Sequence, residues 1–247
     1  MAGSLDGHRI AITGASSGIG EATAEALARE GAQVALGARR KDRLDDLAGR
    51  IGDGAHAFEV DVTDEDAANG FIDDAAEAMG GLDGLVNNAG VMLLGLVTGA
   101  ETEEWRRMIN LNLLGLLYCT HAAIPKMQEA GGGHIVNVSS VAGRSANMGS
   151  AVYNMTKFGV TAFSEALRQE VLNADIRVTC LEPGFVETEL QGHNENEMVQ
   201  ENIEKMRDQI GQTLKSEDMA NAILYALSQP DHVAVNEILV RPTKQTR

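Results

Sequence analysis

The sequence predicts an α/β fold in which helices cover both faces of a seven-stranded parallel β-sheet. Short apolar runs typical of buried strands alternate with longer helical runs along the whole chain. A glycine-rich turn joins the first strand to the first helix, as in proteins that bind dinucleotides. The chain has 247 residues, of which 44% are hydrophobic, so it can bury one sizeable core, and we expect residues 1–247 to form a single domain.

The first strand and the turn after it carry the clearest signal. Residues 9–13 (RIAIT) form a short apolar strand, the turn reads TGASSGIG over 13–20, and a helical run follows over 21–30. Glycines allow the backbone to bend tightly and approach a pyrophosphate, whose charge the N–H groups at the helix start would meet. An ordinary strand-to-helix turn is the alternative. The candidate cofactor-binding residues here are Gly14, Ser16, Ser17, Gly18, Ile19 and Gly20.

The second strand, 33–38, ends about twenty residues past the glycines, where a dinucleotide-binding protein selects its cofactor. An acidic residue there would bind the ribose 2′-hydroxyl of NAD, but the sequence has Ala38, Arg39 and Arg40. The alanine leaves room, and two guanidinium groups suit a 2′-phosphate, so the sequence favours NADP(H). Alternatively, the arginines are surface charges at a helix start.

The third strand, 55–60, ends in Asp61, whose carboxylate could accept a hydrogen bond from an adenine amino group. An amphipathic helix follows over 64–79, with Thr63 or Asp64 as its N-cap.

The fourth strand, 82–86, closes with the polar tetrapeptide NNAG at 87–90. The carboxyl ends of parallel strands are where such sheets bind ligands, although Asn87 is equally suited to form a turn. The candidate cofactor contacts from these two strand ends are Asp61, Val62, Asn88, Ala89 and Gly90.

A long helical run over 101–129 contains Asn110 and Asn112 among several leucines, with Pro125 toward its end. An asparagine buried among leucines needs hydrogen-bond partners. Each asparagine is therefore either a site residue or a polar spot in the helix frame.

The fifth strand, 134–138, leads to Ser140, and Tyr153 then precedes Lys157 by four positions in a helical run over 151–174. Side chains four apart leave one face of a helix. An ammonium beside the phenol would lower the tyrosine's pKa from about 10 toward neutrality. Such a tyrosine can pass a proton to or from an alcohol oxygen, which the Ser140 hydroxyl could hold. A solvated surface pair is the alternative.

The sixth strand, 176–181, ends in the tripeptide EPG at 182–184, and the polar, methionine-containing stretch 189–211 follows soon after. We interpret 189–211 as a mobile lid over the substrate, with a helical insertion that never moves as the alternative. A helix over 216–228 and a strand over 237–240 complete the pattern.

Composition excludes several classes of function. Acidic residues outnumber basic ones 36 to 20, giving a net charge of −16, which opposes a nucleic-acid or anionic-membrane partner. Cys119 and Cys180 lie in apolar runs and indicate free thiols in a reducing compartment. The six histidines lack paired ligand spacing, so no metal is expected. No run approaches the ~18 apolar residues of a membrane span, and we expect a cytoplasmic protein.

Together these residues resemble the short-chain dehydrogenase/reductase family over nearly the whole chain. The blocks at 13–20, 87–90, 153–157 and 183–184 stand in that family's order and spacing. The resemblance implies a three-layer Rossmann-type fold. It assigns catalysis to Asn112, Ser140, Tyr153 and Lys157, with Asn112 preferred to Asn110 because a glycine, Gly115, follows it by three residues.

The resemblance also assigns roles toward the cofactor. Lys157 would grip the nicotinamide ribose, Thr188 would hold the carboxamide near the Val186 backbone, and Asn112 would anchor a water linking Lys157 to solvent. The further cofactor-binding residues that it implies are Tyr153, Lys157, Pro183, Gly184, Val186 and Thr188.

Within the family, local blocks are similar to clavulanic acid dehydrogenase and to NADP-dependent 3-hydroxy acid dehydrogenases. These blocks are VMLLG at 91–95, NLLGL at 112–116, TELQGH at 188–193 and NEILVRPTKQ at 236–245. The last of them departs from the glycine-rich tail of the family's fatty-acid reductases.

The resulting prediction is an NADP(H)-dependent oxidoreductase that interconverts an alcohol and an aldehyde or ketone. A 3-oxoacyl-carrier-protein reductase is the first alternative, but carrier proteins are acidic and a chain at −16 offers them little attraction. A non-catalytic NADP-sensing protein is the second, and the complete catalytic set argues against it.

Two further expectations concern the substrate and assembly. Met92, Leu93, Leu94 and Met148 should form the wall opposite the lid, which favours a medium-sized, partly apolar carbonyl substrate. The helical runs 101–129 and 151–174 carry more apolar surface than one sheet face should cover, and the family resemblance suggests a homotetramer, with a dimer second.

Overall fold

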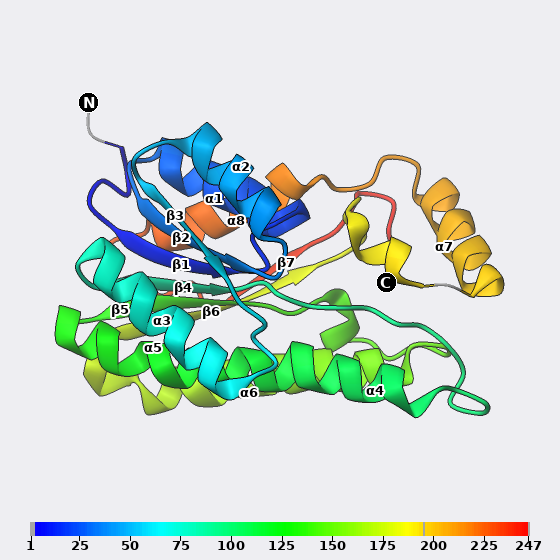
Figure 1. The fold of residues 1–247 in the computed structure, drawn as a ribbon. Helices are drawn as coiled ribbons and strands as arrows, with labels where there is room; N and C mark the ends of the chain where they lie inside the picture. Colours follow the sequence, from blue (N-terminus) through cyan, green and yellow to red (C-terminus); the bar gives the residue numbers. More distant parts are fainter. Residues whose placement is uncertain (1–2, 195, 247) are drawn as a thin grey trace.

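The structure, a computed structural model, describes residues 3–194 and 196–246. Seven strands form one sheet in the order β3-β2-β1-β4-β5-β6-β7, and every neighbouring pair is parallel. Figure 1 shows three layers, with α1, α2 and α8 on one face of the sheet and α3, α4, α5 and α6 on the other. The predicted fold is confirmed.

The strands agree with the predicted runs to within a few residues. They are β1 (Arg9–Thr13), β2 (Gln33–Ala38), β3 (Ala55–Glu59), β4 (Gly84–Asn87), β5 (Gly133–Val138), β6 (Ile176–Pro183) and β7 (Glu237–Val240). Alternate residues of each strand face opposite helical layers. In β1, Ile10 and Ile12 pack with the α1, α2 and α8 side chains, whereas Ala11 faces the other core.

Helices α1 (Gly18–Arg29), α2 (Lys41–Ile51) and α8 (Ser216–Leu227) cover the first face, burying residues such as Leu27, Leu47 and Ile223. Helix α2 was not among the predicted helices. Its run KDRLDDLAGRI is mostly charged, and only Leu44 and Leu47 are buried, so the apolar signal of its sequence is weak.

The second face is covered by α3 (Glu65–Met79), α4 (Thr102–Ile109), α5 (Leu116–Ala130) and α6 (Ala151–Glu170). Asp64 caps α3 by accepting a hydrogen bond from the Ala67 N–H at 2.8 Å. The long helix expected over 101–129 contains a π-helical stretch, η1 (Asn110–Gly115), between α4 and α5. Such stretches are rare and occur often at functional sites, and this one contains Asn112.

By length and composition, the segment Thr102–Ala130 also qualifies as a candidate membrane span, with a mean hydropathy of 1.2 over 18 residues. No run close to the ~18 apolar residues of a membrane span was expected from the sequence, and this segment is an exception to that expectation. Cys119, Ala123 and Met127 of the segment pack in the core against the sheet, so one face of this helix is apolar because the protein itself covers it.

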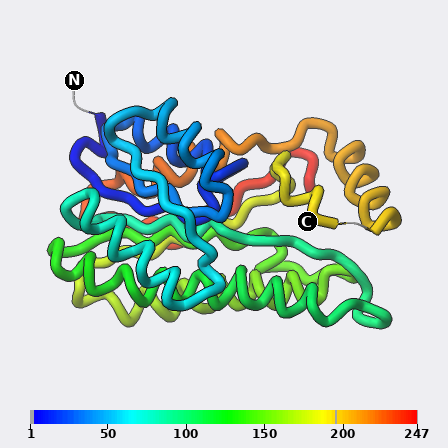
Figure 2. The backbone as a smooth tube through the Cα atoms, viewed as in Figure 1, coloured from blue at the N-terminus to red at the C-terminus, as the bar shows by residue number. Residues whose placement is uncertain are grey.

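The stretch expected as a mobile lid is largely helical. It holds the 3₁₀ helix η4 (Glu189–His193) and α7 (Glu197–Ile210), and the Asn196 side chain caps α7 by accepting from the Met198 and Val199 N–H groups. In Figures 1 and 2, α7 stands beyond the end of the sheet, away from both helical layers. Two short 3₁₀ turns, η2 (Val141–Gly143) and η3 (Leu172–Ala174), complete the elements.

Candidate active site

A cavity of about 1100 Å³ opens at the carboxyl ends of the strands. The strand order reverses between β1 and β4 at this edge, which is where open α/β sheets bind ligands. The predicted site residues that line the cavity are Gly14, Ser16, Ser17, Gly18, Ile19, Arg39, Arg40, Asp61, Val62, Asn88, Ala89, Gly90, Ser140, Tyr153, Lys157, Pro183, Gly184, Val186 and Thr188. Gly20 and Asn112 lie outside this lining, and each contacts a residue that belongs to it, Gly14 and Val91 respectively.

The glycine turn is held tightly against the end of β4. Gly14 has a φ of +65°, and a Cβ on Gly20 would lie 2.4 Å from the Gly14 carbonyl oxygen, so side chains are excluded at both positions. The Asn88 amide donates to the carbonyl oxygens of Thr13 and Gly14 at 3.0 and 3.1 Å. This packing leaves bare backbone facing the cavity at the start of α1, as a phosphate group requires.

Ser140, Tyr153 and Lys157 meet in the cavity. Ser140 caps η2 by accepting a hydrogen bond from the Ala142 N–H at 3.1 Å, and it lines the cavity together with Tyr153. The Lys157 Nζ donates to the Val138 carbonyl oxygen at 2.8 Å and lies 5.9 Å from the centre of the Tyr153 ring. The three side chains predicted from a spacing along the sequence are therefore close in space.

The ionisation of Tyr153 and Lys157 differs from the sequence prediction. Burial raises the pKa of Tyr153 to about 12, and the hydrogen bond with Ser140 opposes this rise only in part. Burial also lowers the pKa of Lys157 to about 8. The prediction that Lys157 draws the tyrosine's pKa toward neutrality is wrong for the free protein, because burial penalises the charged form of both groups.

Asn112 is buried in the π-helical stretch, and its side chain joins the segment after β4 to α6. Its Oδ1 accepts from the Val91 N–H at 2.8 Å, while its Nδ2 donates to the Val91 carbonyl oxygen at 2.9 Å and to Thr156 Oγ1 at 3.2 Å. These bonds fix the backbone after Gly90 next to the helix that carries Tyr153. Asn112 therefore has a positioning role through its side chain.

The two arginines after β2 have different surroundings. Arg40 donates to Ser16 Oγ and Ser17 Oγ, and its Nη1 forms an ion pair with Glu189 at 2.8 Å. The Arg39 side chain is exposed and makes no hydrogen bond or ion pair with the part of the chain that the structure describes. Arg39 therefore offers a free guanidinium group inside the cavity.

Asp61 also keeps a carboxylate oxygen available in the cavity. Its Oδ1 accepts from the Thr63 N–H at 3.0 Å and from the Thr63 hydroxyl at 2.8 Å. Among the described residues no hydrogen bond reaches the other oxygen, which can meet a donor such as an adenine amino group.

Polar side chains fasten the segment after β6, and of these Thr188 was predicted from the sequence as a site residue, but neither Gln191 nor Asn194 was. Gln191 donates to the Val186 carbonyl oxygen at 2.8 Å, and Thr188 caps η4 by accepting from the Leu190 N–H. Asn194 is buried and accepts from the Leu94 N–H at 2.7 Å, a hydrogen bond that joins the predicted lid to the opposite wall. Nothing in the polar run of 189–211 distinguishes Asn194 from its exposed neighbours.

An ion pair between a buried glutamate and a partly exposed arginine supports the loop that follows Ser140. The Glu182 side chain is fully buried and paired with Arg144, which also reaches Glu237 on β7. Burial raises the pKa of Glu182, and the hydrogen bond from Arg144 opposes the rise. The pair ties the loop after Ser140 to the end of β6, next to Pro183.

Apolar side chains from two sides enclose the end of the cavity beyond Tyr153. Met92, Leu94 and Met148 line one wall, as predicted. The prediction for Leu93 is wrong, because Leu93 is buried among Val91, Met108 and Tyr153 beneath that wall. The segment 189–211, predicted as a lid, contributes Leu190, Met198, Ile203 and Met206 to the lining.

The residues present fit a dinucleotide cofactor. The bare glycine turn suits a pyrophosphate, the free Arg39 guanidinium suits a phosphate on the adenosine side, and Asp61 suits an adenine amino group. The described residues hold no group of three or more His, Cys, Asp or Glu side chains arranged for a metal ion.

Comparisons with known proteins agree with this geometry. The family model for short chain dehydrogenases matches residues 8–199. An uncharacterised oxidoreductase of Staphylococcus saprophyticus is 40% identical over 240 residues, which cover 96% of each chain.

Two solved structures are similar over almost their full length. The closed form of a serine dehydrogenase complexed with NADP+ has a TM-score of 0.89 and 33% identity, covering 96% of each chain. A 3-ketoacyl-(acyl-carrier-protein) reductase from Brucella melitensis complexed with NADH has a TM-score of 0.86 and 31% identity, covering 97% of this chain and 99% of that one. On the combined evidence of sheet order, site and relatives, the chain belongs to the short-chain dehydrogenase/reductase family of oxidoreductases.

Proposed function

We propose that this protein is an NADP(H)-dependent alcohol dehydrogenase and carbonyl reductase, in which Tyr153 is the general acid and base. The observation that carries the proposal is that Ser140, Tyr153 and the buried Lys157 line one cavity of about 1100 Å³, with the Lys157 Nζ 5.9 Å from the centre of the Tyr153 ring. A bound nicotinamide would supply or accept the hydride.

Tyr153 gives a proton to the carbonyl oxygen of the substrate, and the Ser140 hydroxyl holds the same oxygen. The pKa of Tyr153, about 12 in the free protein, keeps the phenol protonated and ready to donate. With a pKa of about 8, Lys157 is mostly charged at neutral pH and stabilises the tyrosinate that proton transfer leaves. In alcohol oxidation the same groups act in reverse.

The preference for NADP(H) rests on the second strand end. Ala38 provides no acid for a ribose 2′-hydroxyl, while Arg39 and Arg40 line the cavity at this place. Guanidinium groups bind phosphate through paired, charge-assisted hydrogen bonds. The NADP+ complex of the similar serine dehydrogenase supports the same preference.

The substrate end of the cavity favours a medium-sized, partly apolar aldehyde or ketone. Met92, Leu94 and Met148 line it together with Met198 and Met206 of α7, and methionine side chains adapt to varied apolar shapes. A panel of aldehydes of equal length, with and without a terminal carboxylate, separates this class from substrates of the 3-hydroxy-acid type. Faster NADPH consumption with the uncharged members is the expected result.

The Tyr153→Phe variant tests the mechanism. Removing only the hydroxyl should lower kcat by a factor of roughly 10² or more, the usual scale for a general acid, with NADPH affinity largely kept. Initial rates and a thermal-shift titration with NADPH measure the two effects. High residual activity together with a collapse of NADPH affinity would show that Tyr153 binds cofactor and does not transfer the proton.

A second candidate is a 3-oxoacyl-carrier-protein reductase, which the likeness to the Brucella melitensis enzyme favours. The net charge of −16 opposes it, because carrier proteins are acidic. Acetoacetyl-thioester reduction distinguishes the two: a rate well above that with simple aldehydes would favour the second candidate.

The proposal includes a cytoplasmic location, because Cys119 and Cys180 are both buried free thiols.

It also includes a lid role for 189–211, whose η4 and α7 supply apolar side chains to the cavity. Hydrogen exchange that stays unchanged across 189–211 when NADPH and product bind would remove the lid from the mechanism.

A further inference from the structure

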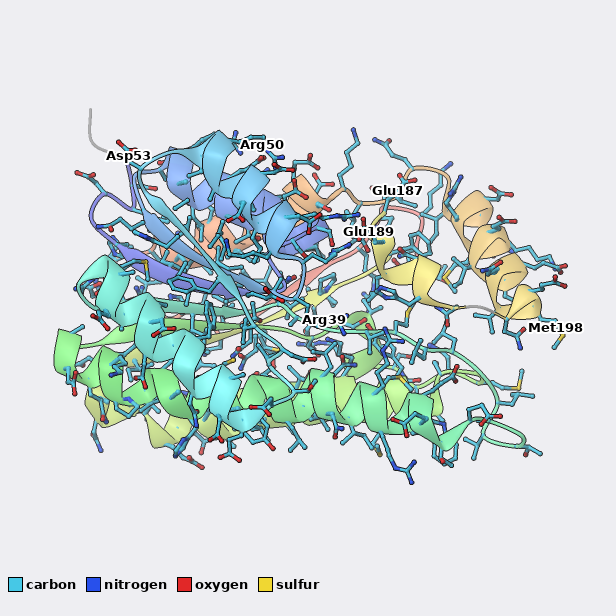
Figure 3. The ribbon with its side chains drawn as sticks, viewed as in Figure 1. Arg39, Arg50, Asp53, Glu187, Glu189 and Met198 are labelled. Atoms are coloured by element: carbon cyan, nitrogen blue, oxygen red, sulfur yellow. The ribbon has the colours of Figure 1, made fainter. Side chains whose placement is uncertain are left out.

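The Glu189 carboxylate forms ion pairs with two arginines, Arg40 and Arg43, near the place where the 2′-phosphate of NADP(H) is expected to bind. Glu189 is the first residue of η4, and it pairs through Oε2 with Arg40 at 2.8 Å and through Oε1 with Arg43 at 2.6 Å. The two arginines lie 149 and 146 residues away along the chain. Figure 3 shows Glu189 and Arg39 between the strand ends and α7, which carries Met198.

Most donors of Arg40 are already used. Its Nε and Nη2 donate to Ser16 Oγ at 3.1 and 3.0 Å, Nη2 also donates to Ser17 Oγ at 2.8 Å, and Nη1 is held by Glu189. A 2′-phosphate can therefore bind Arg39 directly, whereas the Nη1 of Arg40 is already bound to Glu189. To bind both arginines, the phosphate must replace the Glu189 carboxylate.

The Glu189 ion pairs are of a kind that a phosphate can displace. The side chains of Arg40, Arg43 and Glu189 are 40%, 45% and 47% exposed, and ion pairs that are this open to water contribute little. A phosphate monoester carries about twice the charge and has three acceptor oxygens. The hydrogen bonds from Arg43 and Arg40 lower the pKa of Glu189 to about 2, so the competitor stays charged at every working pH.

We propose that Glu189 is a specificity-determining residue that competes with the 2′-phosphate of NADP(H) for Arg40 and sets the affinity for that cofactor. The inference rests on the proposed preference for NADP(H). Because NADH has no 2′-phosphate, it does not need the Nη1 of Arg40 that Glu189 binds. Glu189 therefore leaves the affinity of the protein for NADH unchanged. Glu189 therefore weakens NADP(H) binding selectively.

The test is the Glu189→Gln variant, with Glu187→Gln as a matched control. Glu187 lies two residues away, is 64% exposed and comes no closer than 4.0 Å to Arg207, so the control removes one negative charge from the same segment without touching Arg40. Calorimetric dissociation constants are measured for NADPH, NADH, adenosine 2′,5′-bisphosphate and adenosine 5′-monophosphate on the full chain.

The expected result is a three- to tenfold tighter binding of NADPH and of the bisphosphate by Glu189→Gln, with NADH and the monophosphate unchanged. Glu187→Gln should change every constant by less than twofold. If the wild type prefers NADPH but the two variants behave alike, or if Glu189→Gln binds NADPH more weakly, the role of Glu189 is overturned alone. Equal wild-type affinities for NADPH and NADH would overturn the cofactor preference and this inference together.

Discussion

Replacing Lys157 by Met should stabilise the protein at neutral pH while it removes activity. Burial lowers the pKa of Lys157 from its ordinary value of 10.5 to about 8. Each pKa unit corresponds to about 1.4 kcal/mol, so the charged lysine costs the folded state roughly 3 kcal/mol below pH 8. Methionine has a similar length and carries no charge, and it avoids this cost.

The loss of one hydrogen bond reduces the gain. Lys157 Nζ donates to the Val138 carbonyl oxygen at 2.8 Å, and such a bond contributes about 1 kcal/mol. The net stabilisation by methionine at pH 7 is therefore about 2 kcal/mol.

The gain should depend on pH in a defined direction. Between pH 8 and 10.5 the unfolded state binds more protons than the folded state, so the stability of the wild type rises with pH. At pH 9.5 the remaining cost of the wild-type lysine is about 1.4 kcal/mol, and the advantage of the variant falls nearly to zero.

Urea denaturation at pH 7 and pH 9.5 measures this prediction. Lys205→Met is the control, because Lys205 is 67% exposed and its loss should change stability by less than about 0.5 kcal/mol at either pH. A Lys157→Met protein that is less stable than the wild type at pH 7, with a difference independent of pH, would refute the argument that burial of the charge dominates at this position.

Three other predictions follow from single features of the structure. Arg39→Gln should weaken NADPH binding by about tenfold or more and leave NADH nearly unchanged, because a charge-assisted bond to phosphate contributes about 1.5–3 kcal/mol; equal losses for both cofactors in a fluorescence titration would contradict it. Arg144→Met leaves the buried Glu182 unpaired and should lower the free energy of unfolding by about 3 kcal/mol at pH 7.5; since burial raises the pKa of Glu182, the loss should shrink as pH falls to 5 and the carboxyl takes up a proton, and denaturation curves at the two pH values check the sign. Helix α6 exposes 51% of Met155 and 42% of Phe158, and we expect these side chains to be covered in a homotetramer, with a dimer second; light scattering that shows a monomer at micromolar concentration would exclude both.

The sequence alone predicted the parallel sheet, the glycine turn and the residues around the cavity. Strand and helix runs are local patterns, since side-chain periodicity and glycine placement are properties of neighbouring residues. The four-residue spacing of Tyr153 and Lys157 also specifies one helix face without knowledge of the rest of the chain. Helix α2 was missed because its charged run buries only Leu44 and Leu47.

The tertiary structure decided the pKa values of these residues and their contacts with distant parts of the chain. The pKa of Tyr153 rises instead of falling because packing removes water from both it and Lys157, and no local pattern encodes that desolvation. The pairing of Arg40 with Glu189 and the hydrogen bond from the Leu94 N–H to the Asn194 side chain join segments 149 and 100 residues apart. Contacts of that separation exist only after the sheet has brought its strand ends together, so the pairing of Arg40 with Glu189 and the attachment of the segment 189–211 to the opposite wall follow from the fold.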